Sequence, residues 1–278
     1  MERVFVFVNQ KGGVGKTTSA VNLGAYLAET GKSVLLVDFD SQANLSSGVG
    51  LANVKPGAYE LISGQAALEE VIRKTQVPNL DVIPSHIDLS GAAIELVDQE
   101  KRDFFLKQAL EPARNRYDYI LIDCPPSLGV LTLNGLAAAD SVLIPMQCEY
   151  FAMEGLSLLL RTIKRIQKNL NPRLKIGGIF FTMYDQRTRL AQDVVKEVSA
   201  YFKDTVFTTI IPRNVRISEA PSYGLPISRY DPESSGARAY KSLTDEMLRR
   251  IDDGDAAEYS AGETGPQENS AEGIFVHG

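Results

Sequence analysis

Residues 4–18 read Val4-Phe5-Val6-Phe7-Val8-Asn9-Gln10-Lys11-Gly12-Gly13-Val14-Gly15-Lys16-Thr17-Thr18. In this stretch an apolar run leads into a glycine-rich loop. Glycines let the backbone turn tightly and point its N–H groups at phosphate oxygens, and a following helix N-terminus adds its dipole. Lys16 can then reach the β- and γ-phosphates, and the Thr17 hydroxyl can bind Mg²⁺. The segment predicts a strand, a phosphate-binding loop and a helix.

Short apolar runs alternate with helix-like stretches along the rest of the chain. Most runs are continuously apolar, as in strands that are covered on both faces. The alternation predicts an α/β fold with a doubly wound, mostly parallel sheet, helices on both faces, and ligands at the carboxyl ends of the strands. The expected strands are Val4–Val8, Val34–Asp38, Leu80–Ile83, Tyr119–Asp123, Ser141–Pro145, Ile176–Thr182 and Val206–Ile211. The expected helices include Thr17–Thr30, Lys101–Asn115, Met153–Asn169 and Leu190–Lys203.

Composition divides the 278 residues into a body and a tail. We expect one folded domain over residues 1–251, because a chain that is 44% hydrophobic can bury a sizeable core. Residues 252–278 hold seven Asp/Glu and no Lys/Arg, which predicts an acidic, disordered tail. No apolar run is long enough for a membrane span or a signal peptide, so we expect a cytosolic protein.

The glycine-rich loop departs from the pattern G-x-x-x-x-G-K-[ST], because Gln10 stands in place of the first glycine and Lys11 follows. The pattern K-G-G-x-G-K-T-T is the deviant Walker A motif, and in it the chain resembles the ParA/Soj/MinD family of ATPases. The resemblance implies a P-loop ATPase that uses ATP and Mg²⁺. The implied nucleotide-binding residues are Lys11, Gly12, Gly13, Val14, Gly15, Lys16, Thr17 and Thr18.

The resemblance also gives Lys11 a role outside its own subunit. In the family, the lysine at the start of the loop crosses a dimer interface and contacts phosphates held by the other subunit, as an arginine finger supplied in trans does. Lys11 and Lys16 are therefore catalytic candidates, and Gly12 has to stay small because another backbone comes close. The alternative for Lys11 is a solvated loop lysine.

Two carboxylates follow the second expected strand, in Asp38-Phe39-Asp40. The carboxyl end of a strand faces the ligand in this architecture. The resemblance implies that Asp40 orients or activates the attacking water, which makes it the third catalytic candidate. It also implies that Asp38 bonds to Mg²⁺-bound water or to Thr17. A turn carboxylate that caps the next helix is the alternative, above all for Asp38.

An apolar strand that ends in aspartate recurs at Tyr119–Asp123. This is the Walker B pattern, in which the aspartate holds Mg²⁺ directly or through water. The expected metal site consists of Thr17, Asp123 and Asp38. The following residues, Pro125-Pro126-Ser127-Leu128-Gly129, match the family's D-x-P-P-S-x-G and predict a stiff loop that responds to the γ-phosphate.

Two later segments resemble family stretches beside the adenine, Phe181-Thr182-Met183-Tyr184-Asp185 and Ile211-Pro212-Arg213-Asn214. Pro212 and Asn214 are the candidates for base contacts, with ordinary turn chemistry as the alternative. The resemblance covers roughly residues 3–250.

The charge distribution is relevant to nucleic-acid binding. A net charge of −6 argues against such binding, but residues 161–216 carry twelve Lys/Arg against four Asp/Glu. Such a segment meets phosphates or forms an ordinary solvated face, and charge alone leaves both open. Partitioning members of the family bind DNA without sequence preference as ATP-bound dimers. Lys164 and Lys168 are secondary candidates for phosphate contacts, and the primary ones, expected in loops, are Arg187, Arg189, Arg213 and Arg216.

The implied function is chromosome or plasmid segregation by an ATP hydrolase that is slow unless a partner stimulates it. Its ATP-dependent homodimer would bind nonspecific double-stranded DNA. A ParB/Spo0J-like centromere-binding protein would stimulate hydrolysis and release the dimer. We expect a cytoplasmic, nucleoid-associated protein without a membrane partner.

Three other functions stay open. A MinD-like membrane-associated positioning ATPase needs a basic terminal helix, whereas residues 252–278 are acidic. A redox carrier like the nitrogenase iron protein needs cluster cysteines, and Cys124 and Cys148 stand in a different motif context. A related tyrosine kinase carries a Tyr-rich tail, and here the tail holds Tyr259 alone.

Overall fold

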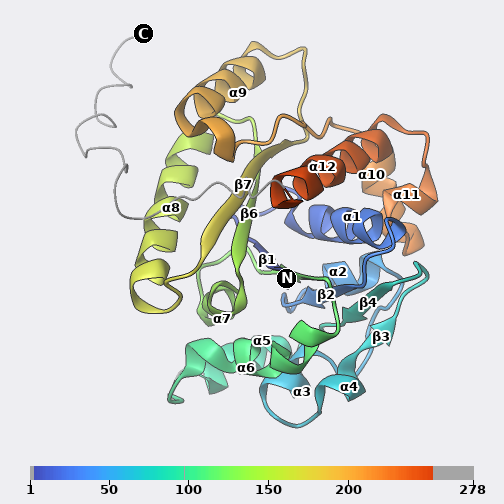
Figure 1. Cartoon of the computed structure of the whole chain (residues 1–278), viewed down its shortest axis with the longest axis vertical. Helices are drawn as coiled ribbons and strands as arrows, with labels where there is room; N and C mark the ends of the chain where they lie inside the picture. Colours follow the sequence, from blue (N-terminus) through green and yellow to red (C-terminus); the bar gives the residue numbers. More distant parts are fainter. Residues whose placement is uncertain (1–2, 97, 253–278) are drawn as a thin grey trace.

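A seven-stranded sheet forms the centre of the protein, in the order β3-β4-β2-β5-β1-β6-β7 (Figure 1). The computed structural model describes residues 3–96 and 98–252, so the expected disorder of the acidic tail concerns residues that lie, after Asp252, outside the described part. All neighbouring strands run parallel except β3 and β4. The strands are β1 (Arg3–Phe7), β2 (Val34–Asp38), β3 (Arg73–Lys74), β4 (Leu80–Ile83), β5 (Tyr119–Asp123), β6 (Ser141–Gln147) and β7 (Lys175–Thr182).

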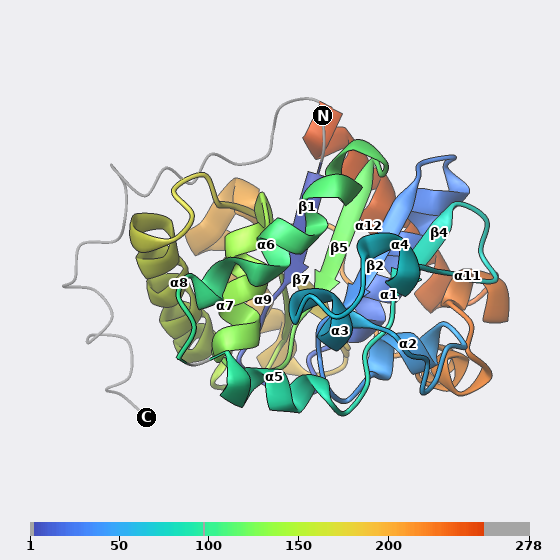
Figure 2. The ribbon, with the colours of Figure 1, turned by 90° about the horizontal axis from the view of Figure 1, so that it is seen from below.

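Helices cover both faces of the sheet, which confirms the predicted doubly wound α/β fold (Figures 1 and 2). One layer holds α1 (Lys16–Glu29), α2 (Asn44–Gly48), α10 (Val215–Glu219), α11 (Ile227–Tyr230) and α12 (Ser235–Asp252). The other holds α3 (Ala58–Ile62), α4 (Leu68–Val71), α5 (Leu89–Glu95), α6 (Phe105–Leu110), α7 (Val130–Ala138), α8 (Ala152–Asn169) and α9 (Arg189–Phe202). Short 3-10 helices are η1 (Arg102–Phe104), η2 (Glu111–Asn115), η3 (Lys203–Thr205) and η4 (Ala220–Tyr223).

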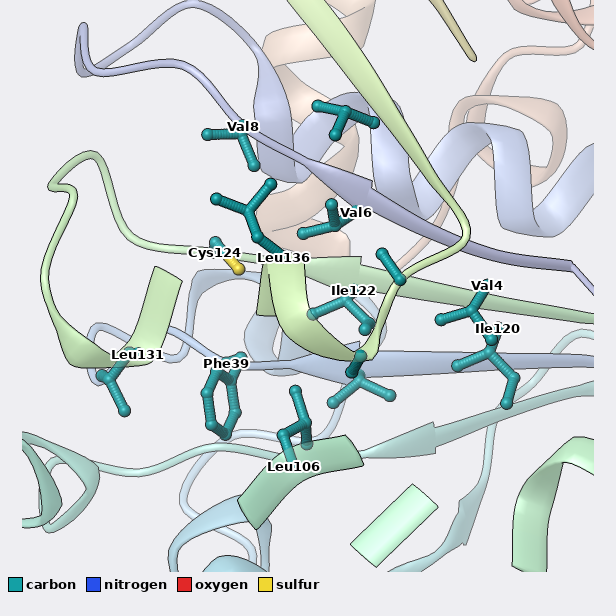
Figure 3. Close-up of a cluster of buried hydrophobic side chains, with 14 of the residues drawn as sticks. Val4, Val6, Val8, Phe39, Leu106, Ile120, Ile122, Cys124, Leu131 and Leu136 are labelled. Carbon is teal, nitrogen blue, oxygen red and sulfur yellow. The ribbon is translucent and has the colours of Figure 1, made fainter. Parts of the chain in front are cut away.

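The central strand β1 shows why the core has two layers. Successive side chains of a strand point to opposite faces. Val4 and Val6 join the cluster under α7 and α8, which Figure 3 shows, whereas Phe5 and Phe7 join the cluster under α1 and α12. All four side chains are buried, so an apolar residue is needed at each of these four positions.

The order of the strands places the functional site. From β1 the chain crosses over to β2 on one side, and from β5, the neighbour of β1, it crosses to β6 on the other. The connection after β1 runs through α1, and that after β5 runs through α7 on the opposite face. The carboxyl ends of β1 and β5 therefore border a topological switch point, where α/β sheets bind ligands.

The predicted strand Val206–Ile211 is wrong. Only single bridges join this segment to the sheet, from Val206 to Ile179 and from Pro212 to Tyr184. Between the bridges, the N–H groups of Thr208 and Thr209 donate to the carboxylate of Glu246 on α12, at 2.8 and 2.9 Å. A side chain from a distant helix thus accepts the hydrogen bonds that a strand would have formed.

The predicted helix Lys101–Asn115 is interrupted: η1, α6 and η2 follow one another there. Asn134 of α7 accepts the N–H of Leu106 at 3.1 Å and donates to the carbonyl of Arg102 at 2.8 Å. These bonds satisfy the backbone where α6 begins. Pro112, which lacks an N–H, lies in η2 and stops α6 from continuing.

The close packing of Gly178 in β7 leads to a stability prediction. A Cβ atom at this position would lie 2.1 and 2.7 Å from two ring carbons of Phe207. That ring is held edge-on to Phe180 and lies 4.2 Å from the guanidinium of Arg250. We therefore expect Gly178→Ala to lower the free energy of unfolding by about 1–3 kcal/mol in urea titrations.

The control for this prediction is Gly155→Ala on the exposed side of α8. Nothing lies within 4 Å of a Cβ atom there. Alanine in an open helix interior should raise the free energy of unfolding by roughly 0.5–1 kcal/mol. An equal effect of the two substitutions would contradict the close packing at Gly178.

Candidate nucleotide-binding site

The glycine-rich loop between β1 and α1 is held by side chains from β6 and β7. Gln147 donates to the carbonyl of Gly13 at 3.0 Å, and Thr182 donates to the carbonyl of Val14 at 2.8 Å. Gly13 and Gly15 have φ angles of 74° and 85°, a left-handed conformation that side chains disfavour. Because the two carbonyls are engaged on the sheet side, the loop is preorganised for its N–H groups to meet an anion.

Lys16, the first residue of α1, is a buried ammonium group. It is 7% exposed, and no carboxylate lies within ion-pair distance of it in the described part of the chain. Burial lowers its pKa, and the nearby charges of Asp123 and Asp40 oppose that shift. A buried cation beside a loop of free N–H groups fits a polyphosphate, which would supply the missing counter-charge.

Asp123 and Thr17 meet at the end of β5. The Thr17 hydroxyl donates to Oδ2 of Asp123 at 2.6 Å, whereas Oδ1 is buried and has no hydrogen-bond partner among the described residues. Burial raises the pKa of Asp123, and the nearby charge of Asp38 raises it further. A hydroxyl and a carboxylate with an unused oxygen are the hard oxygen ligands that Mg²⁺ prefers. These two residues therefore fit the predicted metal site.

Asp38 lies beside Asp123 in the sheet register but bonds elsewhere. Its Oδ2 accepts the N–H and the hydroxyl of Ser46 in α2, at 2.8 and 2.6 Å. Complete burial raises its pKa to about 6. The expected hydrogen bond to Thr17 is not made, because Thr17 bonds to Asp123. In this structure Asp38 ties the next helix to the strand, as the alternative expects, and its bond to Mg²⁺-bound water stays a prediction.

Asp40 is partly exposed in the loop after β2. Its Oδ1 accepts the N–H of Gln42 at 3.0 Å, and Ala43 continues the turn with a φ angle of 53°. The charge of Asp40 acts on the ammonium group of Lys16, so the two side chains belong to one site. A carboxylate that water can reach, next to a phosphate-binding lysine, has the position that a water-orienting residue needs.

Lys11 and Gly12 lie on the outer side of the loop. The ammonium group of Lys11 forms an ion pair with Glu149, and both side chains are about half exposed, at 50% and 53%. A Cβ atom at Gly12 would meet nothing within 4 Å, and Gly12 is not among the positive-φ glycines. Neither space nor backbone conformation within the described chain requires glycine at this position.

The base-contact candidates lie where the segment after Ile211 returns to the carboxyl end of β7. Pro212 pairs with Tyr184 in a bridge. Asn214 is the N-cap of α10: Oδ1 accepts the N–H of Arg216 and Nδ2 donates to Ser235, both at 2.8 Å. Both polar atoms of Asn214 thus make hydrogen bonds within the turn, and base contacts by Pro212 and Asn214 stay a prediction.

The four arginine candidates differ in their surroundings. The expected loop positions are right for Arg187 and Arg213 but wrong for Arg189, the first residue of α9, and Arg216, in α10. Arg187 donates to Asp185 at 2.9 and 2.6 Å, and Arg216 to Glu219 at 2.9 Å. The side chain of Arg189 is 93% exposed, with a carboxylate oxygen of Asp193 3.8 Å away. Arg213 is exposed and has no ion pair within the described residues, so Arg189 and Arg213 are the more available cations.

The two cysteines lie away from any cluster of possible metal ligands. Cys124 is 1% exposed and Cys148 is partly buried. Burial raises the pKa of both thiols, that of Cys148 to about 12. Within the part of the chain that the structure describes, three or more His, Cys, Asp or Glu side chains do not come together as a possible metal site.

Four residues of the site had been missed as functional positions. Gln147 and Thr182 anchor the loop, Ser46 holds Asp38, and Glu149 pairs with Lys11. Gln147 and Thr182 end their strands, and polar residues at the carboxyl ends of parallel strands are a usable signal.

No helix in the described ranges has the length and apolarity that a membrane crossing requires.

Comparisons with known proteins agree with this geometry. A family profile described as "AAA domain" matches residues 2–176. The chromosome-partitioning ATPase Soj of Treponema pallidum is 63% identical, over 90% of this chain and 98% of its own. The solved structure of cobyrinic acid a,c-diamide synthase from Mycobacterium smegmatis, with an ATP analogue and magnesium, is 38% identical with a TM-score of 0.82, over 91% and 97% of the two chains. A putative plasmid partition protein of Borrelia burgdorferi bound to AMPPNP is 27% identical with a TM-score of 0.77, over 90% and 100%.

Proposed function

The chain belongs to the Soj/ParA family of chromosome-partitioning ATPases, and on this premise we propose that it is an ATP-dependent dimerising switch that segregates a chromosome or plasmid. Two subunits close over two ATP molecules, each with Mg²⁺. The closed homodimer binds nonspecific double-stranded DNA, which places it on the nucleoid. A ParB-like centromere-binding protein accelerates the slow hydrolysis, and the dimer then leaves the DNA.

The contrast between the two loop lysines carries the proposal. Lys16 is buried beside Asp123 and Asp40, whereas Lys11 lies outside that site, half exposed. An exposed ion pair such as Lys11–Glu149 stabilises by only about 0–1 kcal/mol, so Lys11 can exchange Glu149 for a phosphate. The open space at Gly12 supports the same arrangement, since a Cβ position there meets nothing within 4 Å and the loop of a second subunit has room to approach.

The residues of one subunit divide the work at the nucleotide. Lys16 and the N–H groups of residues 12–18 hold the β- and γ-phosphates, and Asp40 orients the attacking water. Thr17 and Asp123 would hold Mg²⁺, and the ion would supply positive charge at the phosphates. Lys11 of one subunit stabilises the phosphates held by the other. The ATP analogues bound by the solved relatives support a nucleoside triphosphate as the ligand of this site.

The decisive experiment measures DNA retention with ATP, with ADP and without nucleotide, at several salt concentrations. We expect retention with ATP alone, falling steeply as salt rises, because phosphate contacts release counterions. Equal DNA retention with ATP, with ADP and without nucleotide would rule out the proposed switch.

Substitution of the available arginines tests which residues make the phosphate contacts. We expect Arg189→Ala and Arg213→Ala to weaken ATP-dependent DNA retention on every sequence and to reduce the salt slope by about 1 each. Arg187→Ala and Arg216→Ala should have smaller effects, because Asp185 and Glu219 already engage those cations. Lys107→Ala on α6 is the control, and an equal loss with it would refute the assigned face.

A further inference from the structure

The exposed face of α8 is a basic stripe. Arg161, Arg165 and Lys168 recur at the spacing of one helix face and are exposed, with Lys164 beside them, while Leu159 and Ile163 are buried on the opposite side. Residues 155–184 contain six Lys/Arg and no Asp/Glu. We define the basic stripe by its four members on α8: Arg161, Lys164, Arg165 and Lys168.

The basic stripe has no ion-pair partner within the described residues, and the one acidic residue of α8, Glu154, lies in the first turn of that helix. None of its four members makes an ion pair there, in contrast to Arg114, Arg116 and Arg250. α7, which packs against α8, carries no charged residue between Val130 and Ala138. α9, the other neighbour, brings Asp193 and Glu197, but its own Arg189 and Lys196 balance them. The positive charge of the stripe is therefore uncompensated.

The chain itself contains a matching segment of opposite charge. Residues 253–278 hold six Asp/Glu and no Lys/Arg. No other stretch of similar length in the sequence is so one-sidedly acidic. The two unbalanced segments are complementary in sign and nearly equal in charge, which is the condition for electrostatic docking.

The described end of the chain lies at the same edge of the sheet as the end of α8. Arg250, in the last turn of α12, donates to the carbonyls of Asp204 and Val206, both at 2.7 Å. Ile251 borders a small cavity together with Ser141 and Gly177, near the first residues of β6 and β7. α8 ends at that edge too, because the chain passes from Asn169 into β7 at Lys175. The start of the acidic segment is therefore on the correct side of the molecule.

We propose that residues 253–278 dock on the basic stripe of α8. The reach is ample: 26 residues extend to about 85 Å at most, whereas the 18 residues of α8 span about 27 Å. Each exposed ion pair is weak, but attachment to the same chain gives the acidic segment an effective concentration on the order of millimolar. Docking is therefore favoured at low salt and released at high salt. This inference does not depend on the proposed function.

Zero-length carbodiimide cross-linking of the full chain tests the proposal. The reagent couples carboxylates to lysines that lie in contact, and peptide mass mapping locates the products. At low salt we expect Glu258 and Glu263 to couple to Lys164 and Lys168 within one chain. Lys196, exposed on the neighbouring α9, serves as the reference lysine. We expect the cross-linking yield at Lys164 and Lys168 to be at least five-fold higher than at Lys196. This preference should disappear at high salt, where the Debye length is about 3 Å.

Variants that leave both target lysines in place make the test specific. The double change Arg161→Gln, Arg165→Gln should reduce the cross-links at Lys164 and Lys168 several-fold, whereas Arg238→Gln, Arg249→Gln on α12 should leave them unchanged. Thermal unfolding of each variant checks that it folds. Equal coupling at Lys196, links only between two chains, or stripe lysines shielded by co-purified nucleic acid would each overturn the proposal.

Discussion

Replacing Lys16 with alanine is expected to weaken ATP binding by about 100- to 1000-fold and to abolish ATP-dependent dimers. The ammonium group is the one buried cation at the loop, and hydrogen bonds from a charged donor to phosphate contribute about 1.5–3 kcal/mol each. Two such bonds to the β- and γ-phosphates, each near the lower end of that range, contribute about 3–4 kcal/mol, which corresponds to the expected loss of affinity. Titration with a fluorescent ATP analogue measures the affinity, and light scattering at fixed protein concentration measures the dimer.

Lys32→Ala is the matched control, since Lys32 follows the other end of α1. It should bind ATP and dimerise like the unaltered chain. The assigned role of Lys16 is wrong if the ATP affinity of Lys16→Ala is within three-fold of that of the unaltered chain. Circular dichroism checks that both variants are folded.

Replacing Asp40 with alanine should give the second large effect, a loss of hydrolysis with ATP binding retained. Positioned acid–base or water-orienting groups typically contribute 10²- to 10⁴-fold, so the rate should fall by roughly that factor. Because ATP stays bound, closed dimers should accumulate on DNA. Single-turnover phosphate release measures the rate, and DNA retention after a chase with ADP measures the trapped dimer.

Asp40→Asn separates the carboxylate from the shape of its loop. The amide oxygen can still accept the N–H of Gln42, which is 3.0 Å from Asp40 in the structure. If the charge matters, Asp40→Asn is as slow as Asp40→Ala, whereas Asp245→Ala on the exposed side of α12 is unaffected. Hydrolysis at the normal rate by Asp40→Ala would show that the water is oriented by another group.

Local patterns were sufficient for the centre of the site. The strand–loop–helix segment around Lys16 and the strand that ends in Asp123 follow from short-range rules, because glycine conformation, strand burial and helix dipoles depend on adjacent residues. β2, β4 and β5 have the predicted bounds for the same reason. Asp123 ends β5 and Thr17 lies in the first turn of α1, and their hydrogen bond joins two members of the predicted metal site.

Local patterns failed where a distant side chain accepts backbone hydrogen bonds, and counting charges residue by residue missed ion pairs between near neighbours. The apolar run after Val206 looks like a strand, but Glu246 accepts its N–H groups, and nothing near the run announces that. The charges of Arg187 and Arg216 count as free cations in a sequence, whereas folding pairs them with Asp185 and Glu219.

Sequence by itself determined the fold class, the phosphate loop and the presence of carboxylates at two strand ends, since these depend on the order of residue types along the chain. Tertiary structure alone decided which partner each of these groups has. Asp38 accepts a hydrogen bond from Ser46. Lys11 forms an ion pair with Glu149, which is 138 positions away along the chain. The physical reason is that hydrogen bonds and ion pairs act over a few ångströms in space, and only the packed sheet brings those atoms within that distance.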